Sequence, residues 1–227
     1  MSDLFTASER DAVHRVIKAR RDIRHFSSRP VPEEAMHRIL EAAHHAPSVG
    51  FMQPWNFIMV TSRDIRRQIK DSFERTNRQQ LAQLTEKERK ELYRSLKLEG
   101  IMEAPVNVAV TCDRRRDAPF VLGRGPMPET DLYSTCLAIQ NMWLAARVEG
   151  IGIGWVSILD KPFVEKLLQL PEGVELVAYL CVGYPERFGD KPMLEELGWK
   201  KRLALGDLVF ENAWGQRLSS FQTTEED

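Results

Sequence analysis

The chain has few cysteines and no sign of a secreted or membrane-spanning protein. Its three cysteines, Cys112, Cys136 and Cys181, are far apart and odd in number, which indicates neither a disulfide framework nor a paired zinc motif. Each lies in an apolar stretch, and we interpret all three as small core residues. No apolar run approaches the ~20 residues of a membrane helix, and no signal peptide precedes the first charged segment. We therefore expect a cytoplasmic protein.

The sequence also lacks a large net charge and several common catalytic motifs. The 32 basic residues balance 33 acidic ones, so nothing global favours nucleic acid or an anionic membrane, and any anion site must be local. We find neither a P-loop nor a G-x-S-x-G motif. The five histidines stand at no metal-ligand spacing, and the adjacent His44 and His45 point apart on a helix. No metal site is predicted.

Three alternating glycines, Gly150, Gly152 and Gly154, imitate a dinucleotide-binding fingerprint. That fingerprint needs a strand before the glycines and a helix after them, whereas here a helical pattern comes first and a strand pattern follows. We expect instead that the glycines let the backbone approach a flat ligand or a neighbouring element closely.

The apolar pattern predicts a single α+β domain over residues 1–227. Because the expected helices and strands do not alternate strictly, α+β is favoured over a doubly wound fold. The expected strands are 57–60, 106–110, 155–158 and 177–182, and the expected helices are about 9–20, 33–43, 130–149 and a short one after Asp160.

Two segments stand apart from this pattern. Residues 62–100 are crowded with charged side chains and carry only thin apolar stripes, which predicts helices. These helices are either a lid over something or a solvated helical hairpin, and the sequence favours neither. A lid would exclude water and shield reactive intermediates. Residues 186–227 are expected to form a C-terminal arm.

What the chain does have is a dense basic run at the end of its first predicted helix. Arg20, Arg21 and Arg24 lie within five positions and enclose Asp22. Because a planar guanidinium can donate two parallel hydrogen bonds to a phosphate, Arg20, Arg24 and the distant Arg202 are candidate phosphate ligands, with Lys200 as a long-range point charge. An acid is out of place if the run only holds an anion, so Asp22 points to chemistry. The plainer alternative is a basic helix end that complements its own dipole.

Four separate sequence blocks follow one another along the chain. They are Arg-Arg-x-x-Arg-x-Phe at 20–26, Ala46-Pro47-Ser48 with Gln53-Pro54-Trp55, the run from Gly150 to Trp155, and Lys200-Lys201-Arg202-Leu203. In this order, and over about residues 10–215, they resemble the nitroreductase family of FMN-binding flavoproteins. The resemblance implies a nitroreductase-like fold, in which helices flank a central, mostly antiparallel sheet and 62–100 is a helical lid insertion. It also implies a homodimer with flavin at the subunit interface.

Within that family, one branch is matched more closely. Asp22, where a typical member has Ser, together with Ser157 and the polar segment 62–100, resembles the branch that destroys reduced FMN. That branch uses dioxygen to fragment and contract the flavin to 5,6-dimethylbenzimidazole, the lower ligand of cobalamin, and releases erythrose 4-phosphate. The resemblance implies reduced FMN as substrate, dioxygen as co-substrate, a separate flavin-reducing system and no metal. Two alternatives stay open: an NAD(P)H oxidoreductase that retains FMN, and a non-catalytic flavin-binding protein.

The resemblance assigns catalysis to Asp22 and Ser157. Asp22 would act as a general base or position a water, with its pKa lowered by the neighbouring arginines and raised by a closed apolar pocket. Ser157 would hydrogen-bond the flavin ring edge. The alternatives are an ion-pairing Asp22 and a structural strand serine. The FMN-binding residues implied are Arg20, Arg21, Asp22, Ile23, Arg24, Ser48, Lys97, Gly154, Trp155, Lys200 and Arg202, with Arg21, Ser48 and Lys97 near the ribityl chain or ring edges.

Overall fold

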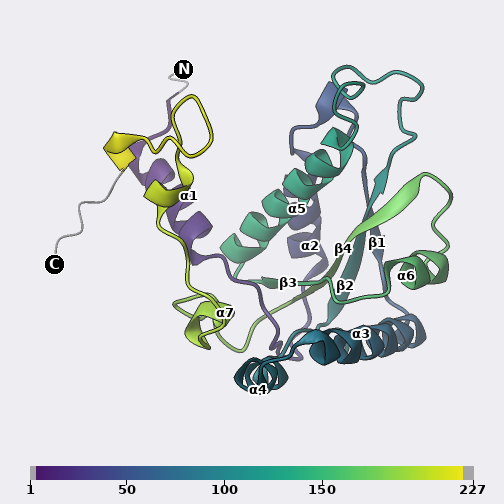
Figure 1. Cartoon of the computed structure of the whole chain (residues 1–227). Helices are drawn as coiled ribbons and strands as arrows, with labels where there is room; N and C mark the ends of the chain where they lie inside the picture. The colour runs from purple at the N-terminus through teal and green to yellow at the C-terminus, as the bar shows by residue number, and fades with distance from the viewer. Residues whose placement is uncertain (1–3, 222–227) are drawn as a thin grey trace. The chain divides into compact units, whose positions relative to one another are not determined.

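Four antiparallel strands form the centre of the structure, a computed structural model that describes residues 4–221 (Figure 1). The central strands β2 and β4 pair with each other, and β1 and β3 form the two edges. The predicted α+β fold with a mostly antiparallel sheet is confirmed. The strands are β1 (Trp55–Met59), β2 (Val106–Asp113), β3 (Gly152–Val156) and β4 (Val174–Gly183).

Helices cover both faces of this sheet because its central strands are apolar on both sides. Successive strand residues point to opposite faces. Val108 and Val110 therefore pack in one core cluster with α2 and α5, whereas Ala109 packs in another with α3 and α6. Figure 1 shows the sheet between these helices. The helices are α2 (Glu33–His44), α3 (Arg63–Gln83), α5 (Thr130–Val148) and α6 (Lys161–Leu167).

Two sequence predictions need correction. Cys112 and Cys181 are buried, but Cys136 is exposed, because it lies on the face of α5 that points away from the sheet. The sequence predicts the third strand at 155–158, yet β3 begins at Gly152 and ends at Val156. Its glycines weaken the strand signal in the sequence, although both belong to the hydrogen-bonded ladder.

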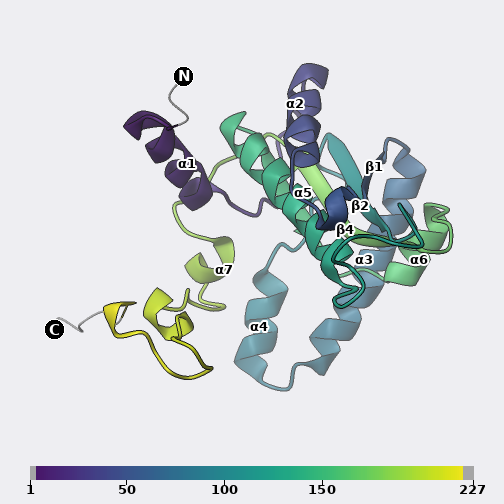
Figure 2. The ribbon, with the colours of Figure 1, turned by 90° about the horizontal axis from the view of Figure 1, so that it is seen from above.

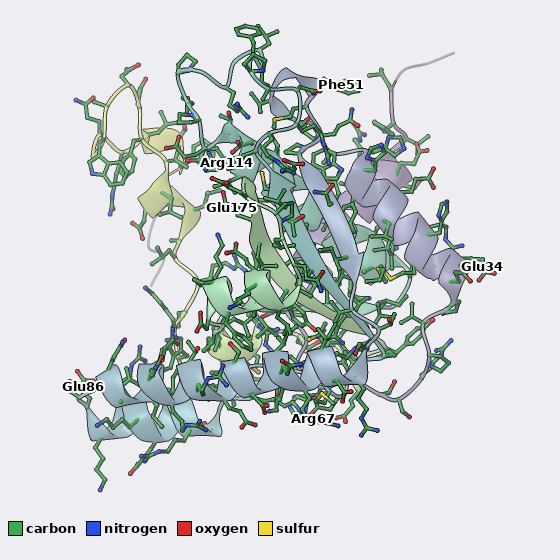
Figure 3. The ribbon with its side chains drawn as sticks, turned by 90° about the vertical axis from the view of Figure 1, so that its right-hand side faces the viewer. Glu34, Phe51, Arg67, Glu86, Arg114 and Glu175 are labelled. Carbon is green, nitrogen blue, oxygen red and sulfur yellow. The ribbon has the colours of Figure 1, made fainter. Side chains whose placement is uncertain are left out.

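The segment 62–100 is partly core and partly a projecting hairpin. Ile69 and Phe73 of α3 are buried in the core cluster, and the Arg66 guanidinium donates to three backbone carbonyls at the base of the segment. The rest of α3 forms a hairpin with α4 (Lys87–Ser95), which reaches away from the sheet (Figure 2) with Glu86 at its tip (Figure 3). Its lid role stays a prediction.

The chain divides into two compact units, one ending at Asp190 and one beginning at Lys191. The first also contains α1 (Ala7–Ala19) and the short helix η1 (Val49–Phe51). The second holds α7 (Met193–Glu196), η2 (Leu205–Leu208) and η3 (Ser219–Phe221). The single domain with an arm from residue 186 stays a prediction, and 222–227 of that arm lie outside the described residues. No helix in 4–221 is long and apolar enough to cross a membrane.

Residues 20–24, which follow α1 and are called the strip below, lie directly against the edge strand β3. Asp22 forms a parallel bridge with Ile153, and the Ile23 N–H donates to the Ile153 carbonyl at 3.0 Å. A Cβ on Gly154 would collide with the Ile23 carbonyl oxygen, and it would lie 2.5 Å from Nη1 of Arg24. The expectation that the glycines admit a neighbouring element is confirmed for this position.

We predict that Gly154→Ala lowers the free energy of unfolding by about 1–3 kcal/mol, the usual cost of overpacking a tight contact. Urea unfolding measures the change. Gly125→Ala is the matched control, because an added Cβ there meets no atom within 4 Å. Equal unfolding midpoints for the two variants would show that the contact between strip and strand is not tight.

Candidate active site

The carboxylate of Asp22 is the centre of a small hydrogen-bonded cluster on the edge of β3. Its Oδ1 accepts from the Trp155 backbone N–H at 3.0 Å and from Nη1 of Arg24 at 3.0 Å. Its Oδ2 lies 2.5 Å from Nη2 of Arg24. Nη2 of Arg24 also donates to the Trp155 carbonyl at 2.7 Å. The backbone N–H of Trp155 therefore holds the Asp22 carboxylate, and the backbone carbonyl of Trp155 holds the Arg24 guanidinium.

The two charged groups of this cluster differ in exposure. The Arg24 side chain is 9% exposed, whereas the Asp22 side chain is 43% exposed, so a small molecule can reach the carboxylate. Desolvation by the surrounding protein raises the pKa of the Asp22 carboxyl above its ordinary value, and the charge of Arg24 and the Trp155 N–H offset only part of this rise. Of the two influences expected from the sequence, desolvation is the larger.

Arg20 and Arg21 have different surroundings. The Arg20 guanidinium lies over the Trp143 ring, with its carbon 4.7 Å from the ring centroid. The Arg21 guanidinium donates to the backbone carbonyls of Lys18, Arg20, Gly189 and Asp190. Arg21 therefore ties the end of α1 to the chain near residue 190, and its predicted contact with a ribityl chain or ring edge stays a prediction.

Three further predicted residues lie in the same unit but outside the cluster. Ser157 is exposed just after the end of β3, two positions beyond Trp155. The ammonium of Lys97 pairs with Glu103 at 2.9 Å. The Ser48 hydroxyl accepts from the Gln53 N–H at 3.0 Å.

Ser48 lies at the other end of α5 from the strip. The residue after it, Val49, donates its N–H to the Ser134 hydroxyl at 3.0 Å near the start of α5. The strip contacts α5 at Trp143, nine positions later, or about 14 Å along the helix. One chain therefore does not bring Ser48 beside Asp22.

Lys200 and Arg202 belong to the second unit. Both side chains are exposed, and together with Lys201 they line a hollow whose other walls are largely leucines of the same unit. Their predicted phosphate contact stays a prediction.

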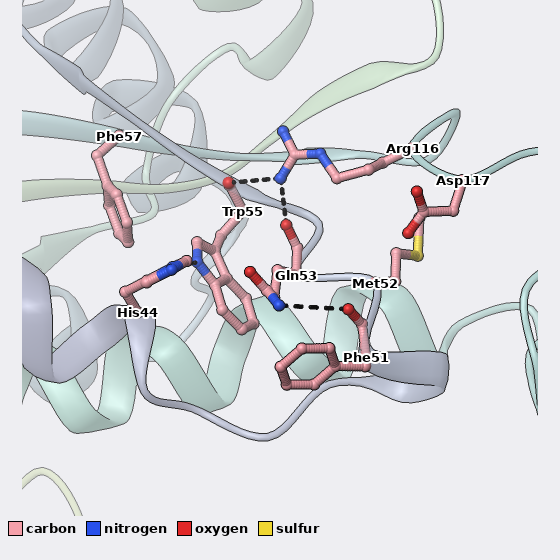
Figure 4. Close-up of a pocket in the computed structure, with 8 residues that line it drawn as sticks. All are labelled: His44, Phe51, Met52, Gln53, Trp55, Phe57, Arg116 and Asp117. Carbon is pink, nitrogen blue, oxygen red and sulfur yellow. Dashed lines mark hydrogen bonds between the residues drawn. The ribbon is translucent and has the colours of Figure 1, made fainter.

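A separate hollow of about 400 Å³ lies at the opposite edge of the sheet, beside β1 (Figure 4). Its walls include His44, Trp55 and Arg116. The Trp55 indole N–H donates to Nδ1 of His44 at 3.3 Å, and Arg116 donates to the carbonyls of Gln53 and Trp55. These donors therefore serve protein acceptors rather than converging on an open position.

Trp143 lies in the helix predicted over 130–149 and is not among the predicted site residues. Its Nε1–H donates to the Arg21 carbonyl at 3.2 Å and to the Ile153 carbonyl at 3.1 Å. The centroids of the Trp143 and Trp155 rings are 6.4 Å apart. A half-buried tryptophan usually finds an acceptor for its N–H. From the sequence, this tendency predicts that the Trp143 N–H has a hydrogen-bond acceptor, but it does not identify the acceptor.

Comparison with known proteins agrees with the fold. A sequence model described as the nitroreductase family matches residues 17–184. The solved structure of oxidized iodotyrosine deiodinase bound to FMN and 3-iodo-L-tyrosine is similar at a TM-score of 0.65 and 26% identity, over 78% of this chain and 91% of that one. The antiparallel sheet, with helices on both faces and residues 20–24 against the edge strand β3, is that of a nitroreductase-fold protein. The chain belongs to the nitroreductase family.

Two relatives are similar along most of their length. A protein of Rhodospirillum rubrum named 5,6-dimethylbenzimidazole synthase is 46% identical over 199 residues, which cover 88% of this chain and 94% of the relative. A protein of Rhodobacter capsulatus with the same name is 41% identical, over 88% and 96%. The predicted branch of the family is confirmed.

We predict that the Asp22 carboxyl titrates above 3.8 in the folded protein, because desolvation outweighs the lowering effects of Arg24 and the Trp155 N–H. Ionisation of Asp22 then lowers the free energy of unfolding. This loss is absent well below pH 3.8, where the carboxyl is protonated in both the folded and the unfolded state, and it is complete above the pKa of the folded state. Carbon NMR of the Asp22 carboxyl measures the midpoint.

Arg24→Gln should raise this midpoint further, since the positive charge of Arg24 lowers the pKa. Arg38→Gln is the control, because Arg38 pairs with Glu149 on the surface. A midpoint at or below 3.8 in the unmodified protein would show that the ion pair dominates.

Proposed function

We propose that this chain is a 5,6-dimethylbenzimidazole synthase that consumes reduced FMN and dioxygen and releases erythrose 4-phosphate. The observation that carries the proposal is Asp22, an acid fixed on β3 by Trp155 and Arg24 and still 43% exposed. The chain also shares 46% identity with a relative of that name. A separate reducing system supplies the flavin in its reduced form.

The residues of the strip fit a flavin. The Nε–H of Arg24 is a buried donor for which the described residues offer no hydrogen-bond partner, and a buried donor of this kind favours an acceptor on a ligand. Arg20 would hold the phosphate, because a guanidinium suits a phosphate oxygen pair. Arg24, predicted from the sequence as a phosphate ligand, pairs instead with Asp22, so Arg24 and Trp155 would lie toward the ring. Reduced FMN supplies electrons to dioxygen and the ring carbons of the product.

Asp22 is the acid–base residue of the proposal. Its raised pKa brings it closer to neutral pH than an ordinary carboxyl, which makes proton transfer in both directions easier. The Trp155 N–H and Arg24 hold the carboxylate in one place while it gains or loses a proton. Ser157 is exposed two positions beyond Trp155, and its hydroxyl can donate to or accept from the ring edge.

Asp22→Asn should bind FMN within a few-fold of the unmodified protein but form at least about 100-fold less benzimidazole, the usual scale of acid–base catalysis. Ser157→Ala should lower the product formed per flavin consumed. Reduced FMN and air are added, and the aromatic product is identified by mass.

The surface carboxyl Asp71 on α3 provides the matched control, Asp71→Asn, which should leave product unchanged. Undiminished product from Asp22→Asn would refute the catalytic role. Sustained nicotinamide oxidation with intact flavin would instead indicate an oxidoreductase, and unchanged flavin after exposure to air would indicate a binding protein.

The proposal includes a homodimer with flavin at the subunit interface. Ser48 and the strip meet α5 at Ser134 and Trp143, about 14 Å apart along the helix, and the resemblance to the nitroreductase family implies that two copies supply the contacts to one flavin. The chain also leaves large apolar side chains exposed on α1 and α5, which is typical of an interface. They include Val13, Ile17, Tyr133 and Leu137.

Light scattering should therefore give a mass of twice 26.2 kDa. Leu137→Glu should lower this mass, because it places a charge on an apolar contact. A mass of a single chain for the unmodified protein, at micromolar concentration and with FMN present, would contradict the dimer.

A further inference from the structure

The indole of Trp143 contacts two neighbouring residues of the strip, the Arg20 side chain and the Arg21 backbone. The face of Trp143 lies under the Arg20 guanidinium, 4.7 Å from its carbon. Its N–H edge donates to the Arg21 carbonyl at 3.2 Å. The same N–H reaches the Ile153 carbonyl of β3 at 3.1 Å. Trp143 thus contacts, from α5, the cation proposed for phosphate and the peptide group that leads into Asp22.

The two peptide groups that flank Asp22 are held by the Trp143 indole N–H and the Ile153 carbonyl. The carbonyl of Arg21, on the N-terminal side, accepts from Trp143. The N–H of Ile23, on the C-terminal side, donates to the Ile153 carbonyl at 3.0 Å, and this carbonyl also accepts from Trp143. The backbone at Asp22 is therefore fixed on both sides, which fixes the starting point of its side chain.

We propose that Trp143 is a positioning residue that holds the phosphate-binding cation and the acid Asp22 in a single arrangement. The inference rests on the proposed function for the roles of Arg20 and Asp22. The ring face would orient Arg20 by a cation–π contact, and the indole N–H would set the distance of Asp22 from the Trp155 N–H. Trp143 itself does not touch the reacting atoms.

The two contacts can be separated by substitution. Phenylalanine keeps an aromatic face but lacks the N–H donor, whereas leucine lacks both. Trp143→Phe should therefore disturb Asp22 and spare Arg20, and Trp143→Leu should disturb both. Trp55→Phe is the matched control, because it also removes a part-buried indole N–H bond, to His44, at the opposite edge of the sheet.

The first experiment measures binding of FMN and riboflavin by fluorescence quenching, without turnover. Trp143→Leu should weaken FMN binding about 3–30-fold, the usual range of a cation–π contact, and leave riboflavin, which lacks the phosphate, nearly unchanged. Trp143→Phe should bind FMN within about threefold of the unmodified protein. In an Arg20→Ala background, Trp143→Leu should have no further effect on FMN binding.

Additive losses in the double variant would overturn the proposal for Arg20, since Trp143 would then act elsewhere. Equal losses for FMN and riboflavin would do the same, because they would indicate a merely structural role. If Trp143→Leu does not fold by circular dichroism, the same double-mutant cycle with Trp143→Met carries the test, since methionine also lacks the aromatic face and the N–H donor but is flexible enough to fill irregular gaps.

The second experiment measures product formation. Trp143→Phe should lower kcat about 10–100-fold, the scale of a small misplacement of a catalytic group, with KM for reduced FMN unchanged. The Asp22 ionisation in its pH profile should move upward, because a weaker bond from the Trp155 N–H favours the protonated carboxyl. An unchanged kcat and pH profile would overturn the proposal for Asp22.

The two experiments keep this inference distinct from the proposed function. If the unmodified protein forms no benzimidazole, the proposed function fails, while the binding cycle between Trp143 and Arg20 still gives its own answer. If product forms normally but the cycle is additive and Trp143→Phe retains full kcat, only the positioning role fails.

Discussion

The hydrogen bond from the Trp155 N–H to the Asp22 carboxylate, 3.0 Å long, is the interaction on which the rest of the site depends. It holds an acid on the edge of a sheet beside a buried arginine, where desolvation raises its pKa. The bond can form only because Gly154 has no side chain to keep the strip away from β3. A change at this edge therefore alters the position, charge and proton affinity of the acid together.

The remainder of the fold supports this edge from two sides. The sheet is packed on both faces, so β3 rests on a rigid core rather than on solvent. Helix α5 crosses one face and contacts the strip through Trp143 near its end, while its start binds the loop after Ser48 through Ser134. The helix thus separates the two predicted flavin contacts, while the exposed apolar side chains on α1 and α5 support the proposed interface between two copies.

Much of the fold was predictable from the sequence, because its central strands are short, continuous apolar runs and most of the helices that cover them have apolar faces. The strand β2 begins at the predicted Val106. β3 was misplaced because its glycines are poor strand formers, and Cys136 was misassigned because an apolar neighbourhood does not reveal which helix face a residue occupies. The charge pattern correctly grouped Asp22 with Arg24. It did not reveal that Arg21 is occupied by backbone carbonyls, nor that Trp143 supports Arg20, since both depend on contacts between residues more than a hundred positions apart.

The most direct measurement follows the fate of the flavin itself. Reduced FMN labelled with carbon-13 in its dimethylbenzene ring is turned over in air by the unmodified protein, and both labelled flavin and labelled benzimidazole are quantified by mass. We expect one molecule of benzimidazole for each molecule of flavin lost. Full recovery of labelled FMN after repeated aerobic turnover, without labelled benzimidazole, would contradict the role given to Asp22 and its surroundings.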